Sequence, residues 1–459
     1  MKTLTKGHPL KVILLFAVPL YIGQLFQLCY SLIDTRIIGS ALGEASLAAV
    51  GTTTSLSDLL IEFLNGIICG FGVIIARVYG AGDESRLKRI IGCTVTLSVL
   101  ATLLISGSCL LFLPEILKLL NVEKALMPGA SAYIRIIIAG LLATTLYNIC
   151  TAVLRSIGDS FTPLIFLILA NLLNIGLDCL FVYGLDSGVA GAATATVIAQ
   201  ILSALLCFLY MRQKYPQLRI TLQHLLPDSG LCRELVPSGL SMGFMISFVT
   251  LGSLALQTCI NTFGSHIIVA HTAARKVTMI FLIPFFVLGT ALATYCGQNL
   301  GAKEYARIHR GIRDTIMASF LWCILVILIV FTLSPALVHL VTASSDPEIL
   351  ETAALYLKIN AVFYFLPAAI CILRNSMQGF GDTKTPLVSS LIELAGKVLI
   401  AFLLAPVIGY MGVIISEPIV WALMIVPLLV GMKLPKPIFP PPPERYKTSD
   451  NNSGPPPTE

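Results

Sequence analysis

Charged residues are scarce in this chain: Asp, Glu, Lys and Arg together make up 12% of its 459 residues, whereas soluble domains have about 25%. Apolar residues make up 56%, and apolar runs near 20 residues recur, each long enough to cross about 30 Å of hydrocarbon as a helix. So little charge cannot cover a soluble surface. The alternating segments of about 10 residues that build membrane β-barrels are also missing. The chain is therefore predicted to be an all-α integral membrane protein.

The sequence also lacks the motifs of common enzyme and metal sites. Its twelve Cys include no CxxC pair, so neither zinc ligation nor a disulfide framework is expected. HExxH, GxSxG and paired-His motifs are absent, although a membrane-embedded enzyme would need a nucleophile–base or metal constellation in its spans. We therefore expect no enzyme activity and no cofactor. The net charge is +6, and the Lys and Arg that produce it lie between the spans. This charge therefore does not indicate nucleic acid as a partner.

The apolar runs predict twelve spans. The first follows Lys2 and Lys6 in the manner of a signal peptide, but no small-residue cleavage site comes after it, so we expect an uncleaved span. The expected bounds are 10–38, 47–79, 88–113, 128–153, 162–184, 189–211, 234–261, 267–299, 312–341, 350–373, 386–407 and 411–432.

The positive charges between the spans set the expected orientation. One set of loops and the two ends of the chain hold 21 Lys and Arg, whereas the opposite loops hold only Lys118 and Lys124. Loops rich in Lys and Arg stay in the cytoplasm by the positive-inside rule. We therefore expect a multi-pass protein of the plasma (inner) membrane with both termini in the cytoplasm.

One polar turn occurs twice, 223 residues apart: GDSFTP at 158–163 and GDTKTP at 381–386. Gly allows a sharp turn, Asp caps a helix and Pro fits the first turn of the next helix, so each turn is foremost a helix–helix connection. The same shift aligns SAYIRI at 131–136 with ALYLKI at 354–359. The chain is therefore predicted to be two six-span repeats related by an axis along the membrane normal.

This duplication gives the expected domains. They are an N-terminal six-helix lobe at 1–211, a cytoplasmic connection at 212–233, a C-terminal six-helix lobe at 234–432 and a tail at 433–459. The tail holds nine prolines and is expected to be disordered, because such a composition cannot pack a core.

Four polar residues in the first half are the main functional candidates. Ionisable groups inside spans cost about 2.5–3.5 kcal/mol on insertion scales and are functional candidates by default. Asp34 ends the apolar run of the first span, and Asn174 and Asp178 are four apart on one face of the fifth. Thr196 lies in the sixth span among small residues that let helices approach closely.

The second half does not repeat this set. Under the shift of 223 residues, Asn174 aligns with Lys397 and Asp178 with Ala401. A polar cluster that only held helices together would be expected in both lobes. The asymmetry therefore favours a site for a proton or Na⁺ in the first lobe, with helix–helix stabilisation as the alternative.

Six further polar residues in the spans are candidates for lining a cavity, each with a structural alternative. Glu393 and Lys397 are four apart in the order that favours an ion pair on one helix, so a structural pair is the stronger expectation. His271 is a lone His, which is more often a packing residue than a proton carrier. Glu62 and Glu417 have no obvious partner in the sequence. The six are Glu62, His271, Gln298, Glu393, Lys397 and Glu417.

From about residue 10 to residue 432 the chain resembles the multidrug and toxic compound extrusion (MATE) family of cation-coupled transporters. The resemblance is carried by the order and doubled spacing of several motifs. They are SLIDTRIIGSALG, GFGVIIARVYGAGD, LRSIGDSFTPLIFLILANLLNIGLDCLFVYG and GVAGAATATVIAQ in the first half, and IIVAHTAARK, ATYCGQNLGAKE and MQGFGDTKTP in the second.

The resemblance implies two six-helix lobes arranged in a V around a central cavity. It also implies that Asp34 matches the first-span aspartate of the family's N-lobe ion site. Asn174 and Asp178 match its fifth-span residues, Thr196 matches its sixth-span threonine, and Pro19 matches the proline where the first span bends. Some sodium-coupled members also have acids in spans 7 and 10. This chain has none there, which argues against a cation site in the second lobe.

The expected function is antiport: an organic cation or another amphipathic small molecule leaves while H⁺ or Na⁺ enters. The alternatives are a lipid-linked oligosaccharide flippase of the same superfamily, a metabolite exporter and a passive channel. The flippase class commonly has more helices and a strongly cationic cavity, which twelve spans with few Lys and Arg do not match. The expected partners are the small-molecule substrate and membrane lipid, and a monomer is expected.

Overall fold

The computed structural model describes residues 3–120, 122–342 and 346–434, and all regular structure in these residues is helical. The first half contains α1 (Pro9–Gly80), α2 (Glu84–Leu111), α3 (Leu113–Leu119), α4 (Met127–Ser156), α5 (Phe161–Asp178) and α6 (Gly188–Lys214). The second half contains α7 (Ser229–Ile260), α8 (Ser265–Gly301), α9 (Tyr305–Thr342), α10 (Pro347–Val362), α11 (Phe365–Gly379), α12 (Lys384–Leu399), α13 (Ala405–Ile408) and α14 (Tyr410–Gly431). The predicted tail lies outside the described residues from 435 onward.

Short helical turns extend or join these helices. The π-helical turns η1 (Cys179–Gly184) and η4 (Ile400–Leu404) continue α5 and α12. The connection between the halves contains two 3₁₀ turns, η2 (Pro216–Leu218) and η3 (Leu222–Leu225). The predicted connection is therefore not a loose linker, since it folds back as ordered turns.

Twelve spans are present in the described chain, as predicted. Eleven helical segments are long and apolar enough to cross a membrane, and the bent pair α10–α11 makes the twelfth. The helix α1 holds two spans, Pro9–Ser40 and Ser46–Gly80, because Gly43 leaves the helical conformation with φ 78°.

The predicted tenth span, 350–373, is present but bent. It consists of two helices that meet at 55°, with the break at Phe363 and Tyr364. Pro367 explains the position of the break, because proline has no N–H to donate to the carbonyl four residues earlier and its ring clashes with that carbonyl.

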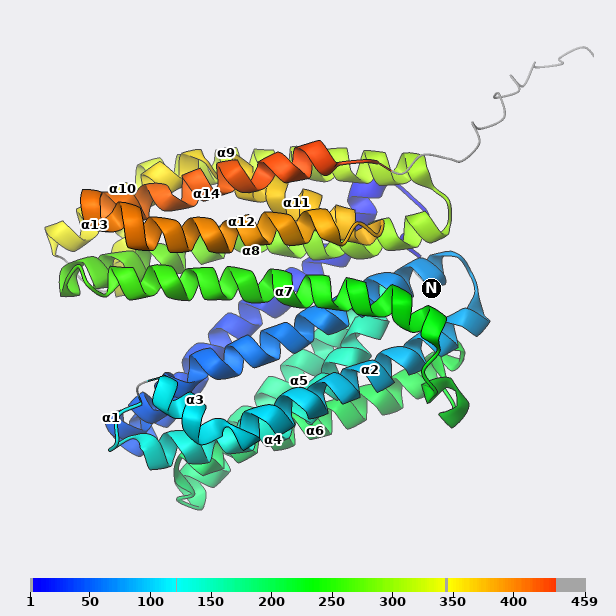
Figure 1. Cartoon of the computed structure of the whole chain (residues 1–459), viewed down its shortest axis with the longest axis horizontal. Coiled ribbons are helices and arrows are strands. Elements are labelled where there is room, and N and C mark those ends of the chain that lie inside the picture. The colour runs from blue at the N-terminus through cyan, green and yellow to red at the C-terminus, as the bar shows by residue number, and fades with distance from the viewer. Residues whose placement is uncertain (1–2, 121, 343–345, 435–459) are drawn as a thin grey trace, which may run out of the picture.

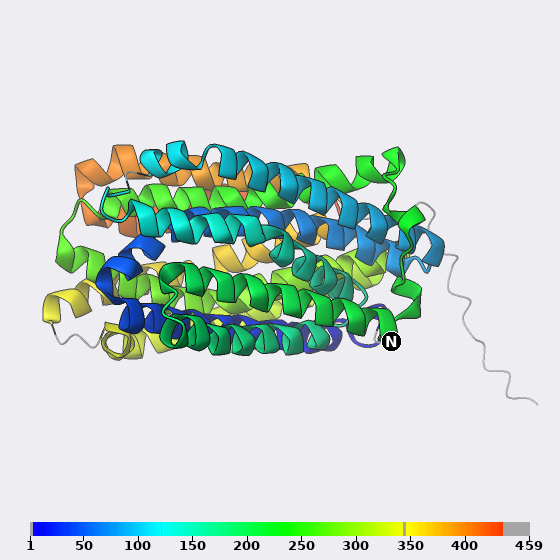
Figure 2. The ribbon, with the colours of Figure 1, turned by 90° about the horizontal axis from the view of Figure 1, so that it is seen from below.

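The helices form two lobes, and their long axes run in nearly one direction in both views (Figures 1 and 2). In Figure 1 the lobes meet at the end that carries the N terminus and diverge toward the opposite end. We call the first of these the basic end. It contains residues 3–8, the connection 215–228, and the turns at 81–83, 157–160, 302–304 and 380–383.

Glycines allow the lobes to touch backbone to backbone toward the basic end. A Cβ added to Gly80 would lie 2.0 Å from the carbonyl oxygen of Gln298, and one added to Gly70 would lie 2.4 Å from that of Ser238. Two side chains donate across the same contact: Ser238 Oγ to Gly70 O at 2.9 Å and Gln298 Nε2 to Ser156 O at 2.7 Å. The lobes are therefore closed against each other at this end.

The first span crosses from one lobe to the other. Its beginning, with Ile13 and Phe16, packs in one apolar cluster with Leu292 of α8. Its later part packs on the N-terminal lobe, where Ile38 shares a cluster with Val182. The beginning of α1 therefore packs on the C-terminal lobe, which a division of the chain at 1–211 does not show.

Candidate functional site

The two polar turns that mark the repeat have the same local structure. Asp159 accepts from the Thr162 N–H at 3.0 Å and the Thr162 hydroxyl at 2.7 Å. Asp382 accepts from the same two atoms of Thr385, at 3.1 and 2.7 Å. Each Asp therefore ties down the start of the helix that follows, as the sequence predicted for a helix–helix turn.

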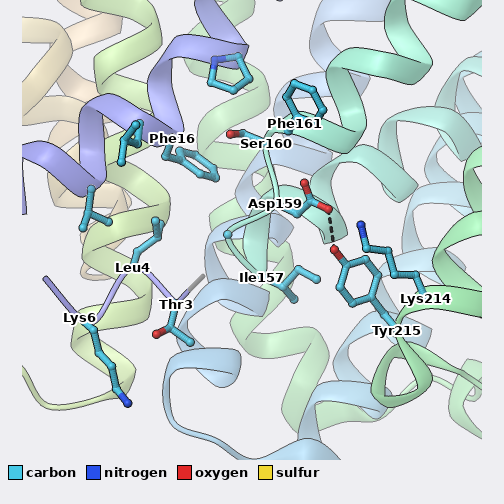
Figure 3. A pocket seen from close by; sticks show the side chains of 14 residues that line it. Thr3, Leu4, Lys6, Phe16, Ile157, Asp159, Ser160, Phe161, Lys214 and Tyr215 are labelled. Atoms are coloured by element: carbon cyan, nitrogen blue, oxygen red, sulfur yellow. Dashed lines mark hydrogen bonds between the residues drawn. The ribbon is translucent and has the colours of Figure 1, made fainter. Parts of the chain in front are cut away.

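The first turn has an additional contact, from outside the turn, that the second does not show among the described residues. The Tyr215 hydroxyl donates to Asp159 Oδ2 at 2.6 Å, which joins the turn to the connection (Figure 3). Burial opposes ionisation of Asp159, but the bonds from Thr162 and Tyr215 outweigh it and hold the pKa of this carboxyl below its ordinary value. The turn borders a pocket of about 820 Å³ at the basic end, which Lys6 and Lys214 also line.

The four predicted coupling residues come together in the N-terminal lobe. The Tyr30 hydroxyl of α1 donates to Asn174 Oδ1 of α5. The Asn174 amide in turn donates to Thr196 Oγ1 of α6 at 3.4 Å, and the Thr196 hydroxyl donates to the Ala192 carbonyl one turn earlier at 3.1 Å. Asp178 lies one turn beyond Asn174 at the end of α5. We call Tyr30, Asp34, Tyr133, Asn174, Asp178 and Thr196 the N-lobe cluster.

The Asp178 carboxyl is the most unusual group of this cluster. It is fully buried, at 0% exposure, and neither of its oxygens has a hydrogen-bond donor among the described residues. The carboxyl of Asp34, which is half-buried on α1, lies close enough to interact with it. Two neighbouring carboxylates repel each other in a poorly solvated place, so the arrangement needs a proton or a cation to neutralise it.

A different polar group occupies the corresponding part of the C-terminal lobe. Lys397 Nζ lies 3.0 Å from Glu393 Oε1 and 3.8 Å from Glu417 Oε1. Arg374 pairs with Glu393 at 3.4 Å and Arg275 pairs with Glu417 at 3.0 Å. We call these five residues the C-lobe network. It joins α8, α11, α12 and α14 and holds three cationic groups against two carboxylates.

The repeat aligns one residue of the N-lobe cluster with one residue of the C-lobe network. Lys397 occupies the position of Asn174, and its ammonium also donates to Ser253 of α7 at 3.4 Å. Tyr356 corresponds to Tyr133. Tyr133 lies within electrostatic reach of the N-lobe acids, and Tyr356 lies within reach of Arg275 in the C-terminal lobe. The same place in each lobe is therefore polar, with an ammonium in one and carboxyls without a cation in the other.

Of the six residues expected to line a cavity, Glu62 is exposed and the other five are buried. The expected Glu393–Lys397 pair is present. Glu417, which had no obvious partner in the sequence, is paired with two cations. His271 contacts the Tyr410 hydroxyl through Nδ1 at 3.1 Å and packs edge-on against Tyr356, which is the structural alternative that the sequence favoured.

Gln298 and Pro19 lie near the basic end. Gln298 is fully buried and accepts from the Leu4 N–H at 2.9 Å while donating to Ser156. It therefore fixes the N-terminal segment to both lobes and lines no open surface. The helix α1 continues through Pro19, and the residue that leaves its helical conformation is Gly43. Pro19 lines the pocket of Figure 3.

Four residues of these groups were not found from the sequence, and one of them, Arg374, was counted only among the positive charges between the spans. Tyr30 stands four residues before Asp34, which puts both on one helix face, and that spacing could have indicated it. Tyr133 aligns with Tyr356 in the repeat, but it was not selected as a candidate because its side chain is uncharged. Arg275 lies 142 residues from its partner Glu417, a contact that no local pattern shows.

A family model described as MatE matches the chain twice, over residues 19–180 and 242–403. The second match begins 223 residues after the first, which is the shift between the two polar turns. The chain belongs to the MATE family of efflux transporters. Family membership and the twelve spans make it a multi-pass membrane protein.

Relatives and solved structures agree with this assignment. The chain is similar to the Probable multidrug resistance protein YoeA of Bacillus subtilis, with 29% identity over 399 residues that cover 85% of this chain and 86% of the relative. It is similar to the Multidrug export protein MepA of Staphylococcus aureus, with 22% identity over 427 residues and 93% of each chain covered.

Among solved structures, an outward-facing MATE family transporter of the MOP superfamily has a TM-score of 0.85 and 25% identity, covering 94% of this chain and 97% of its own. A MATE structure in the bent conformation, at 24% identity, shares the fold with a TM-score of 0.86, and the match covers 94% of this chain and 97% of that one. The two-lobe fold expected from the sequence is confirmed. Export of small molecules is the activity shared with the named relatives.

Proposed function

We propose that this transporter is an antiporter in which H⁺ or Na⁺ binds the N-lobe cluster and drives export of organic cations or other amphipathic small molecules. The observation that carries this proposal is the Asp178 carboxyl, which is fully buried, has no donor among the described residues and faces a second carboxyl. A buried carboxyl that has no positive side chain beside it needs a proton or a cation that can bind and leave.

The ligands of the cluster suit either coupling ion. The carboxyls of Asp34 and Asp178, the Asn174 amide oxygen and the Thr196 hydroxyl are all hard oxygen ligands, which suit a hard cation. Alternatively, one proton neutralises one of the two carboxyls and supplies the missing donor between them. Either occupant removes the repulsion between the two acids.

Span 1 offers a route from ion binding to movement of the lobes. Asp34 lies on the same helix as Ile13 and Phe16, which pack on the C-terminal lobe. A change in the position of Asp34 on ion binding therefore acts on a helix that contacts both lobes. An ion that binds one arrangement of the lobes more tightly shifts the population toward that arrangement.

The proposed direction of transport follows from the charge distribution. The positive-inside rule assigns the basic end, with both ends of the chain, to the cytoplasm of the inner membrane. The lobes touch at this end and diverge at the other. The described conformation then faces outward, which is the state that releases exported substrate and takes up the driving ion.

The decisive test measures transport with each driving force imposed alone. The full chain is expressed in everted membrane vesicles, and a fluorescent organic cation is followed under a pH gradient without Na⁺ and under a Na⁺ gradient without a pH difference. We expect one of these gradients to drive uphill movement of the dye. Dye that only equilibrates, whichever gradient is applied, would reject antiport and leave a passive channel.

A further inference from the structure

The outer face of the N-terminal lobe carries a groove near the basic end. It lies between α2, α4 and α6, has a volume of about 580 Å³ and is bordered at one end by the connection. Its walls are mainly apolar, and the side chains of Ile201, Leu205 and Phe208 are 50%, 51% and 39% exposed along it. We call it the α2–α4–α6 groove. It opens to the side of the lobe, where lipid surrounds a membrane protein.

The charged residues that line this groove are both arginines. Arg212 stands in the last turn of α6 and Arg219 in the connection, and the described lining residues include no Asp or Glu. The 820 Å³ pocket at the basic end differs, because Asp159 lines it together with Lys6 and Lys214 (Figure 3). An anionic group in the α2–α4–α6 groove would therefore meet two guanidinium groups and no opposing carboxylate.

The end of the groove that holds the arginines is well ordered. The Arg219 Nε donates to the Arg212 carbonyl at 2.8 Å, and Leu218 is 3% exposed. The η3 turn rests on α2, where the Thr96 hydroxyl donates to the Leu225 carbonyl at 2.6 Å. A Cβ on Gly92 would lie 2.0 Å from the His224 carbonyl oxygen. The connection is thus packed against α2, and it places Arg219 beside Arg212.

The length of the groove matches half of a bilayer. From Ile201 to Arg212 the helix α6 rises about 16 Å at about 1.5 Å per residue, and the hydrocarbon core is about 30 Å thick. An occupant with an anionic head at the arginines therefore has room for an apolar chain that reaches about as far as one leaflet.

We propose that the α2–α4–α6 groove binds an anionic phospholipid of the cytoplasmic leaflet. Its phosphate lies against Arg212 and Arg219, and one acyl chain lies along α6. Guanidinium groups bind phosphate in a two-point geometry that suits this head group, and basic pockets between spans on the cytoplasmic side bind anionic lipid head groups. The bound lipid would hold the connection on the N-terminal lobe, beside the start of α7.

The test compares lipid binding by the purified full chain and by variants in detergent. The probes are phosphatidylglycerol, phosphatidylcholine and glycerol phosphate, and the readouts are retained lipid by native mass spectrometry and the thermal midpoint. We expect phosphatidylglycerol to bind and to raise the thermal midpoint of unfolding. Phosphatidylcholine and glycerol phosphate should bind at least tenfold more weakly and raise the midpoint less. Equal binding of both lipids would reject the anionic head group, and equal binding of glycerol phosphate would reject the acyl chain.

Variants then locate the site. Arg212→Gln and Arg219→Gln should each weaken phosphatidylglycerol binding about fivefold, which corresponds to about 1 kcal/mol for a basic residue near the membrane surface. Arg233→Gln is the matched control, since Arg233 is an exposed residue near the start of α7 and lies outside the groove. If the double variant keeps wild-type affinity, or if Arg233→Gln loses as much, the lipid binds elsewhere and the proposal is wrong. The assay involves no transport, so its result is independent of the antiport proposal.

Discussion

The described residues of the N-lobe cluster include two carboxyls and no positive side chain, whereas in the C-lobe network two buried carboxyls pair with three positive side chains. The repeat puts Asn174 in the first group and Lys397 in the second at the same position. In one lobe the cation is part of the chain and permanent. In the other lobe the proposed mechanism takes the cation from solution. On that proposal, duplication produced one lobe that responds to an ion gradient and one that is electrostatically fixed.

The largest expected effect is the loss of transport when either carboxyl of the N-lobe cluster is neutralised by mutation. Asp178→Asn and Asp34→Asn remove the charge that an entering ion neutralises, so each should lower gradient-driven dye efflux at least tenfold while the protein stays inserted and folded. Efflux in vesicles, normalised to the amount of inserted protein, measures it. Glu115→Gln, at an exposed position of α3, serves as control. Wild-type efflux by Asp34→Asn would remove the N-lobe cluster as the coupling site.

The second effect concerns stability and should have opposite signs in the two lobes. Glu417→Gln removes the carboxylate that pairs with Arg275 and one of the two carboxylates near Lys397. Because breaking a buried ion pair costs about 3–5 kcal/mol, this variant should be destabilised by about that amount. Glu393→Gln should be destabilising for the same reason while sparing transport in the protein that remains. Asp178→Asn removes an unpaired buried charge and should leave the thermal midpoint unchanged or raise it. A fall of the midpoint in Asp178→Asn equal to that in Glu417→Gln would show that both groups are structural.

The third effect comes from copying the C-lobe arrangement into the N-terminal lobe. Asn174→Lys places an ammonium beside the Asp178 carboxyl, which should stabilise the fold by about 1.5–3 kcal/mol, as a hydrogen bond to a charged group does. It should also abolish the dependence of efflux on the ion gradient. The thermal midpoint and the vesicle assay measure both. A variant that still couples efflux to the gradient would contradict the idea that a fixed cation replaces the exchangeable one.

The smallest effect compares the two polar turns. Tyr215→Phe removes the extra donor to Asp159 and should cost about 1 kcal/mol at neutral pH. Because the pKa of Asp159 in the folded chain lies below its ordinary value of 3.8, this contribution is complete above pH 3.8 and is lost as the pH falls through the lower folded pKa.

Unfolding of wild type and variant at neutral pH and at stepwise lower pH checks this. Asp382→Asn provides the comparison in the other turn, since the described contacts of Asp382 come from its own turn. A difference between wild type and Tyr215→Phe that grows toward acid pH would contradict the expectation.

The features that could be predicted from the sequence are those that depend on the length of apolar runs, on the internal repeat and on the spacing of residues along one helix. Apolar runs gave the twelve spans, and the doubled turn gave the two repeats. The four-residue spacing put Asn174 and Asp178 on one face, and the structure brings them beside Asp34 and Thr196. The Glu393–Lys397 pair followed from the same spacing rule.

What the sequence could not show depends on packing between distant segments. The Arg275 side chain of α8 reaches Glu417 of α14, and Gln298 meets Ser156 because the lobes touch at the basic end. The break in the tenth span was missed although Pro367 marks it, since membrane helices also tolerate proline without breaking. Pro19 in α1 is such a case.

The path of span 1 across the lobes has a consequence for biosynthesis. Phe16 and Ile13 leave the ribosome first, but Leu292 in their apolar cluster is made roughly 280 residues later, which is on the order of tens of seconds at about 5–20 residues per second. During that interval the start of the helix lacks the residues of α8 on which it packs. The packing of span 1 is therefore complete only when the C-terminal lobe exists, and two halves made as separate chains would have to find each other in the membrane.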